Sequence, residues 1–268
     1  MIGSLPGLSR GAAVATSASG QVVAGYSGDD ARFTRPFRWT QSGGFQNLGF
    51  FGDGDPNSSR MLTSDMSADG AVIVGSSRTN LGAVPWRWTE AGGLQALPRP
   101  FDFDADVIGI SSDASAAVGY SRDGSFWRQT IWNLAAVPTT LQLPRLPNNP
   151  SGTTLAFDIS NTGDGLFGHG VQAVVGTSQV SGSGDPVATY WTAAGGMMTL
   201  QAALNANGVS TAGWQFFQAT AVSDDGYTVA GYGRHNGVLE GFVAVIPAPS
   251  TASLAAALLA AAATRRRR

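Results

Sequence analysis

The chain has 268 residues, of which 43% are hydrophobic, and this content excludes a disordered body because it is enough for a core. There is no cysteine, so disulfides and thiolate metal sites are excluded. All 16 basic residues are arginines, and four of them end the chain, which leaves 12 basic against 18 acidic residues in the body. An acidic body without a basic stripe argues against nucleic-acid binding.

One sequence pattern recurs five times along the body. It reads Ser-x-Asp-Gly, then an apolar run closed by glycine, then a segment with tryptophan followed by Gly-Gly; Ser67–Gly75 with Trp86–Gly93 is the clearest copy. The glycines that close the apolar runs are Gly25, Gly75, Gly119, Gly176 and Gly231. Their spacing of 44 to 57 residues is that of a propeller blade and is too long for leucine-rich or helical repeats.

Each copy is predicted to form four short strands. In the second copy these are residues 62–66, 72–76, the segment around Trp88 and the run toward Leu97. The Asp-Gly pair supplies a tight turn after the first strand, and Gly92-Gly93 supplies another before the fourth. Trp86 and Trp88 stand two residues apart, which places them on one face of a strand. No stretch of the body keeps a helical period beyond about two turns.

The two ends of the body complement each other. The fifth copy stops after three strands at about residue 245, whereas residues 2–7 look like a fourth strand that precedes the first copy. We therefore predict a five-bladed β-propeller over residues 1–246, closed by the N-terminal strand, which would hide two sheet edges. The alternative is an open stack of hairpins.

The last 22 residues, 247–268, differ from the body. Pro247-Ala248-Pro249 is followed by an apolar segment at 254–263 and by a basic end, Arg265, Arg266, Arg267 and Arg268. The apolar segment predicts a short hydrophobic helix that is marginal for a bilayer span, with the arginines held on the cytoplasmic side. The alternative is an ordinary C-terminal helix.

These three elements, in this order, resemble the PEP-CTERM sorting signal of bacterial surface proteins, although Ala248 stands where that motif usually has glutamate. The resemblance implies export through the inner membrane, transient membrane contact and processing by exosortase-like machinery. Residues 1–5 have neither the basic nor the apolar region of a signal peptide. We therefore expect a leader upstream of this methionine.

The body resembles the extracellular HAF-type repeat proteins, whose repeats carry Ser-x-Asp-Gly-x-x-Val-x-Gly followed by Ala-Phe-x-Trp-Thr-x-x-Gly-Gly. Ser17–Gly25 with Phe37–Gly44 matches this pattern, as does the second copy. The resemblance implies an extracellular or cell-surface location and carries no catalytic residues, because the family has no defined activity.

Two acidic loops are candidate metal sites. They place oxygen ligands at alternate positions, a spacing that lets a loop wrap Ca²⁺, through Asp53, Asp55 and Asn57 and through Asp102, Asp104 and Asp106. Neither loop continues as a complete calcium-binding loop, and each could equally be a solvated turn. Apart from calcium, no cofactor is expected.

Other conspicuous residues have structural explanations. Asp69, Asp113 and Asp225 are expected to accept hydrogen bonds within their own turns. The tryptophans at one place in four of the five copies are expected to pack between blades: Trp39, Trp88, Trp132 and Trp191. Three others break the repeat register and are expected at the surface: Trp86, Trp127 and Trp214. The two histidines, His169 and His235, are interpreted as polar loop residues, because no nucleophile motif accompanies either.

These features favour an exported, surface-sorted repeat protein with a structural or ligand-binding role in the extracellular matrix and without catalysis. Its ligands would be polysaccharides or proteins bound at the rims or central channel of the propeller. The alternative is a polysaccharide-active hydrolase or lyase on the same scaffold, with acids at the channel mouth. A third hypothesis is an inert body with a functional tail.

Overall fold

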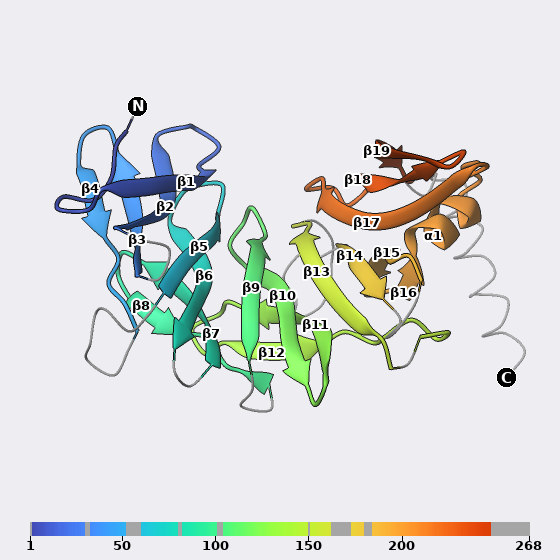
Figure 1. Cartoon of the computed structure of the whole chain (residues 1–268), viewed down its shortest axis with the longest axis horizontal. Coiled ribbons are helices and arrows are strands. Elements are labelled where there is room, and N and C mark those ends of the chain that lie inside the picture. Colours follow the sequence, from blue (N-terminus) through green and yellow to red (C-terminus); the bar gives the residue numbers. More distant parts are fainter. Residues whose placement is uncertain are drawn as a thin grey trace, which may run out of the picture.

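The computed structural model describes residues 2–29, 33–51, 60–79, 82–100, 104–149, 151–161, 173–179 and 184–247. Within these ranges the chain forms nineteen strands and one short helix (Figure 1), which confirms the all-β class. The strands form five successive antiparallel meanders, and each of the first four has four strands.

The bounds of the strands follow the repeats. The first two meanders are β1 (Arg10–Thr16), β2 (Val22–Gly28), β3 (Thr34–Thr40) and β4 (Gly44–Asn47), then β5 (Arg60–Met66), β6 (Val72–Thr79), β7 (Gly82–Thr89) and β8 (Gly93–Ala96). The third and fourth are β9 (Ala105–Ile110), β10 (Ala116–Asp123), β11 (Phe126–Asn133) and β12 (Thr139–Gln142), then β13 (Thr153–Ile159), β14 (Val174–Gln179), β15 (Val187–Thr192) and β16 (Gly196–Thr199). The fifth has three described strands, β17 (Trp214–Val222), β18 (Thr228–His235) and β19 (Val238–Val245).

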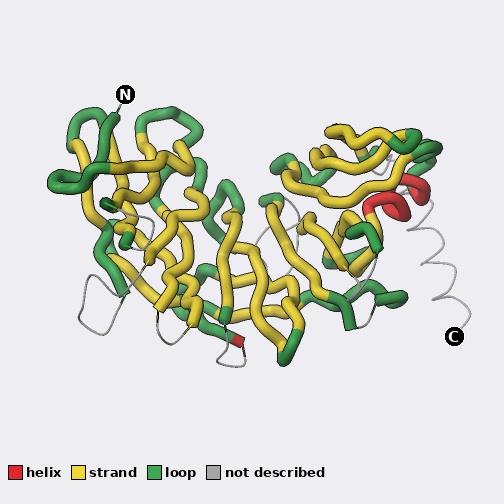
Figure 2. The backbone as a smooth tube through the Cα atoms, in the orientation of Figure 1, coloured by secondary structure: helices red, strands yellow, loops and turns green. Residues whose placement is uncertain are grey.

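The meanders lie along an arc, from the blue N-terminal meander to the red C-terminal one (Figure 1). The first strand of each meander contacts the first strand of the next, from β1 through β5, β9 and β13 to β17. Figure 2 shows that loops and turns join the strands at both ends of each meander. The first two meanders also share one parallel pairing, between Thr34 and Arg60, so they form a single eight-stranded sheet.

The predicted closing strand is absent from the described residues. Residues 2–9 form no strand, and the backbone N–H of Leu5 donates to Ser27 Oγ on β2 at 3.0 Å. Leu5 is buried, so the N-terminal segment packs on the first meander instead of pairing with β19. The prediction that this strand closes the ring is therefore wrong for the described chain: local packing on the first meander holds the segment at the other end of the arc.

The repeat glycines are required by a bulge that recurs in every meander. One residue of the first strand is skipped in the pairing with the second strand, between Thr63 and Asp65 in the second meander. Opposite this bulge, a Cβ added to Gly75 would overlap the carbonyl oxygen of Leu62. The same overlap recurs with the equivalent carbonyl at Gly25, Gly119, Gly176 and Gly231. Only glycine lets the second strand approach so closely.

The hydrophobic core consists of four clusters, one between each pair of successive meanders. Trp88, Trp132 and Trp191 each lie in one of these clusters, which confirms that they pack between meanders. Trp39 has no preceding meander on its side and remains partly exposed. Burial of such large side chains provides most of the attraction between neighbouring meanders.

One helix, α1 (Leu200–Ala206), follows β16 and was not predicted. The Thr199 side chain caps it by accepting the N–H of Ala202, and Leu200, Ala203 and Leu204 are buried against the fifth meander. At seven residues it is too short for a helical period to stand out in the sequence. The described residues contain no helix long and apolar enough to cross a membrane. The predicted C-terminal hydrophobic helix lies outside the described residues.

Candidate functional site: carboxylates of the first strands

Two carboxylates occupy equivalent positions on the first strands of the second and fourth meanders. Asp65 and Asp158 each follow the bulge of their strand. Asp65 Oδ1 accepts the N–H of Met66 at 2.8 Å, and its Oδ2 accepts the N–H of Ile110, on the third meander, at 3.0 Å. Each oxygen of this carboxylate therefore accepts one backbone N–H, and one of these two N–H groups belongs to the next meander.

Asp158 repeats this arrangement one interface further along. Its Oδ1 accepts the N–H of Ile159 at 2.8 Å, and its Oδ2 accepts the N–H of Val222, on the fifth meander, at 2.8 Å. Burial raises the pKa of Asp158 to about 6, and the negative charges of Asp65 and Asp224 add to this. Burial also raises the pKa of Asp65, while its two backbone hydrogen bonds act in the opposite direction.

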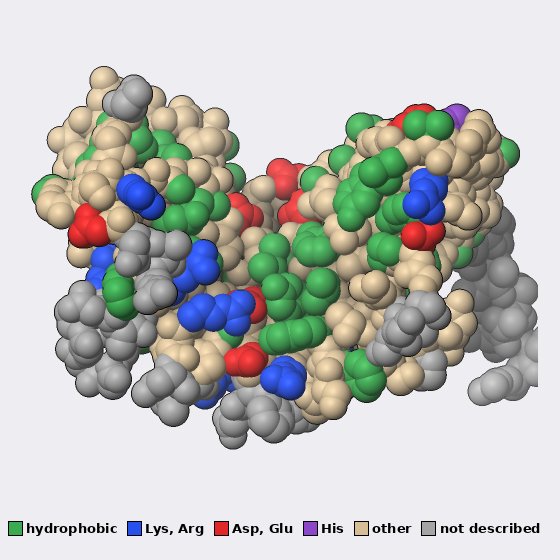
Figure 3. All heavy atoms as spheres, in the orientation of Figure 1, with side chains coloured by type: hydrophobic (Ala, Val, Ile, Leu, Met, Phe, Trp, Pro, Cys, Tyr) green, Lys and Arg blue, Asp and Glu red, His purple; other side chains and the backbone are tan. Residues whose placement is uncertain are grey.

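The Ser-x-Asp-Gly turns bring a third carboxylate, that of Asp224, toward Asp158. Backbone hydrogen bonds join the turns in series: the N–H of Ala18 donates to Ala68 O at 2.8 Å, and the N–H of Ala68 donates to Ser112 O at 3.0 Å. Ser112 Oγ then donates to Asp224 Oδ1 at 2.6 Å, which joins the third meander to the fifth. The turns thus converge, and acidic side chains are visible where the arc is hollowed between its two ends (Figure 3).

The turn aspartates behave as predicted. Ser67 Oγ donates to Asp69 Oδ1 at 2.6 Å, and that oxygen also accepts the N–H of Ala71. The hydrogen bond from Ser67 is the main cause that lowers the pKa of Asp69. The same bonds form at Asp113 and Asp225, from Ser111 and Ser223. These three carboxylates are confirmed as parts of their own turns.

Two of the candidate calcium ligands lie in the described residues and have protein partners. Asp106 Oδ2 lies 2.8 Å from Arg78 Nη2, and the Asp106 side chain is 5% exposed. Asp104 Oδ1 accepts the N–H of Ala83 at 2.7 Å, and its Oδ2 lies 3.8 Å from Arg122. The other candidates, Asp53, Asp55, Asn57 and Asp102, lie outside the described residues. Among described residues, no group of three or more metal-binding side chains forms.

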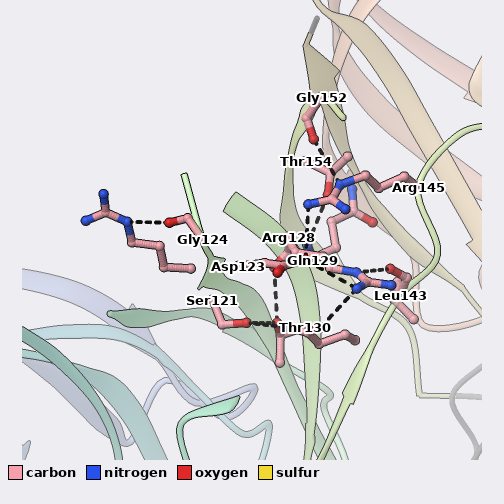
Figure 4. Close-up of polar contacts among 12 residues, drawn as sticks. Ser121, Asp123, Gly124, Arg128, Gln129, Thr130, Leu143, Arg145, Gly152 and Thr154 are labelled. Atoms are coloured by element: carbon pink, nitrogen blue, oxygen red, sulfur yellow. Dashed lines mark hydrogen bonds and ion pairs between the residues drawn. The ribbon is translucent and has the colours of Figure 1, made fainter. Parts of the chain in front are cut away.

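A polar network joins the third and fourth meanders (Figure 4). Asp123 Oδ2 lies 3.4 Å from Arg128 Nη1 and 3.3 Å from Arg145 Nη2. The nearby Gln129 side chain is buried, and its Nε2 donates to Leu155 O at 3.0 Å and to Thr189 Oγ1 at 2.9 Å. The neutral Gln129 side chain makes the bonds that cross to the fourth meander, while the charged groups pair within the third meander and the segment that follows it.

The remaining singled-out residues have different outcomes. His235 is the last residue of β18, so its expected loop position is wrong: it stacks on Trp214 with ring centroids 4.7 Å apart, and its Nδ1 lies 4.0 Å from Glu240. His169 lies outside the described residues. Trp86 is fully buried, so its expected surface position is wrong, because its ring packs into the core between the first two meanders. Trp127 and Trp214 are partly exposed.

Sequence reasoning missed Asp65 and Asp158. A signal was present, because both copies read Asp-x-Ser immediately before the turn, in Asp65-Met66-Ser67 and Asp158-Ile159-Ser160. An acid directly before an apolar residue at the end of a strand, as in Asp65-Met66 and Asp158-Ile159, indicates a specific partner, since burial of an unpaired carboxylate is costly. The partner itself comes from another meander and could not be named from the sequence.

No protein-family model and no curated protein matches this sequence. Solved structures do match. TolB from Acinetobacter baumannii has a TM-score of 0.55 at 12% identity, over 88% of this chain and 52% of that one. A putative TolB from Agrobacterium tumefaciens has a TM-score of 0.53 at 11% identity, over 87% of this chain and 76% of that one.

Prolyl oligopeptidase B from Galerina marginata is also similar, with a TM-score of 0.51 at 9% identity, over 89% of this chain and 38% of that one. This chain therefore spans about half the length of the Acinetobacter TolB and a smaller share of the peptidase. The fold is β-propeller-like. At these identities the likeness concerns the fold alone.

Proposed function

We propose that the chain is an exported, surface-sorted repeat protein with a structural or ligand-binding role in the extracellular matrix and without catalysis. Its five meanders would be the blades of a propeller. The observation that carries this proposal is the use of Asp65 and Asp158: each carboxylate accepts two backbone N–H groups and joins two meanders. Carboxylates used in this way connect the parts of a scaffold.

The alternative, a polysaccharide-active hydrolase or lyase, needs carboxyl groups that face a substrate. Glycoside hydrolysis commonly uses two of them on opposite sides of the scissile bond. The raised pKa of Asp158 is the feature that favours this alternative, because general acids have raised pKa values. Its two backbone donors argue for the scaffold instead, since each oxygen already accepts a backbone N–H, one of them from another meander.

The location is proposed from the tail and from the HAF-type repeats. A likeness in fold to TolB proteins is compatible with an envelope or extracellular location. Of the sorting signal, Pro247 lies at the end of the described residues, and Pro249 with Arg265, Arg266, Arg267 and Arg268 lies beyond them. Exosortase-like machinery would act on this segment after transient contact with the inner membrane.

The proposal can be tested by fractionation and mass spectrometry of cells that make the chain. We expect the body outside the inner membrane, without the terminal arginines. Uncleaved chain in the inner membrane or the cytoplasm would contradict the sorting part. Release of reducing or unsaturated sugars from extracellular polysaccharides by the purified full-length chain, abolished by Asp158→Asn, would favour the enzyme over the scaffold.

A further inference from the structure

A cavity of about 200 Å³ lies between the first and second meanders, with two arginines at its edge. Arg10 begins β1 and Arg60 begins β5, and both line the cavity together with Tyr26, Gly28 and Thr34. Within the described residues, no ion pair or side-chain hydrogen bond engages Arg10, Arg60 or the Tyr26 hydroxyl. On the face shown in Figure 3, most basic side chains lie over the left half of the molecule, where the first two meanders are.

The equivalent place in the interface between the second and third meanders is filled by an arginine side chain. Pairing across the strands makes Gly28 the equivalent of Arg78, because Gly28 pairs with Arg10 and Arg78 pairs with Arg60. Arg78 extends from the second meander to Asp106 on the third, at 2.8 Å. In the first interface the arginine is replaced by Gly28, whose missing side chain leaves space.

The acids of the second interface are also replaced. In the strand register of the third meander, Asp104 lies opposite Arg122 and Asp106 lies opposite Tyr120. The equivalent positions on β5 are Arg60 and Leu62. At these four places the first interface therefore has two arginines, a glycine and a leucine, whereas the second interface has two arginines and two carboxylates. Asp29, the acid that follows Gly28, accepts the N–H of Ser9 at 2.9 Å. Beside the described residues of the first interface, a bound carboxylate would supply the negative charge that Asp104 and Asp106 supply in the second interface.

We propose that this cavity binds a small organic carboxylate, of the size of one sugar acid, between Arg10 and Arg60. Guanidinium groups bind carboxylates through paired, charge-assisted hydrogen bonds. The Tyr26 hydroxyl can add a hydrogen bond to the ligand. The volume is below the usual range of pockets for drug-sized ligands, which limits the ligand to about one ring.

The proposal rests on the ligand-binding part of the proposed function alone. Its test uses purified full-length protein and isothermal titration calorimetry with glucuronate, with glucose as the neutral counterpart of the same ring size. We expect glucuronate to bind and glucose not to bind. Equal binding of both, no binding of either, or equal binding of inorganic sulfate would overturn the assignment. Cell fractionation tests export separately, so the two failures are distinguishable.

Variants locate the site. Arg10→Gln and Arg60→Gln are each expected to weaken glucuronate binding at least about tenfold. Arg234→Gln, an exposed arginine on the fifth meander, is the control and should leave it unchanged. Gly28→Arg should also abolish binding, because it restores the side chain that fills the second interface. Tighter binding by Gly28→Arg would mean that net positive charge alone attracts the ligand, and would overturn the proposed cavity. Thermal melting of each variant verifies folding.

Discussion

Asp158 on β13 accepts the backbone N–H of Val222 on β17 at 2.8 Å, so one carboxylate oxygen joins the fourth meander to the fifth. Asp65 does the same for the second and third meanders, through Ile110. Backbone pairing joins the first two meanders, whereas at these two interfaces a side chain makes the link between separate sheets.

Asp158 makes stability depend on pH. The folded protein raises the pKa of this group from 3.8 to about 6, so it holds the proton more tightly than the unfolded chain does. The stability that this adds is full below about pH 4 and is lost as the pH rises through 6. We expect the free energy of unfolding of the wild type to fall by on the order of 2–3 kcal/mol between pH 4 and pH 7 because of this group. This fall should be absent in Asp158→Asn.

Urea unfolding of both proteins across this pH range measures the effect. Glu90→Gln, at an exposed position, is the matched control and should follow the wild-type curve. Parallel curves for wild type and Asp158→Asn would contradict the prediction. The turn aspartates Asp69 and Asp225, whose pKa values are lowered, act with the opposite sign and only at lower pH.

Gly75→Ala is expected to destabilise the protein by more than about 3 kcal/mol, because the new methyl group would overlap Leu62 O and the Trp86 ring. Gly93→Ala is the control: Gly93 has a positive φ of 61° and open space around its Cβ position, so the cost should be about 1 kcal/mol. Chemical denaturation compares the two. Similar losses would show that the bulge does not require the repeat glycine.

Two buried tryptophans differ in their indole N–H groups. Trp132 Nε1 donates to Pro98 O at 2.8 Å, whereas Trp86 Nε1 has no partner among the described residues. Trp132→Phe is therefore expected to cost about 1 kcal/mol more than Trp86→Phe, since both remove similar volume but only the first breaks a hydrogen bond. Thermal and urea unfolding of the two variants provide the comparison. A larger loss at Trp86 would contradict it.

Two ion pairs have the same N···O distance of 2.8 Å and differ in burial. The Asp106 side chain is 5% exposed beside Arg78, while Asp185 is 51% exposed beside Arg234. In double-mutant cycles with alanine, we expect a coupling energy above about 1 kcal/mol for Arg78 with Asp106 and below about 0.5 kcal/mol for the exposed pair. Equal coupling energies in the two cycles, or a larger one for the exposed pair, would show that burial does not determine the strength of these ion pairs.

The local features of the repeats could be read from the sequence. The turns, the strands around Trp88 and Trp132, and the closing glycines all appear where the pattern places them. Each depends on residues within one copy, such as the hydrogen bond from Ser67 to Asp69. Backbone propensity and side-chain alternation over a few residues are sufficient to determine such features.

Side-chain contacts between different copies of the repeat were decided only by the tertiary structure. The packing of Leu5 on the first meander, the inter-meander role of Asp158 and the burial of Trp86 all involve partners from other parts of the chain. The cavity beside Arg10 and Arg60 exists because Gly28 and Leu62 stand where the next interface has Arg78 and Asp106. A repeat pattern defines each meander, but it does not show which side chains meet across two of them, because that depends on how successive sheets pack.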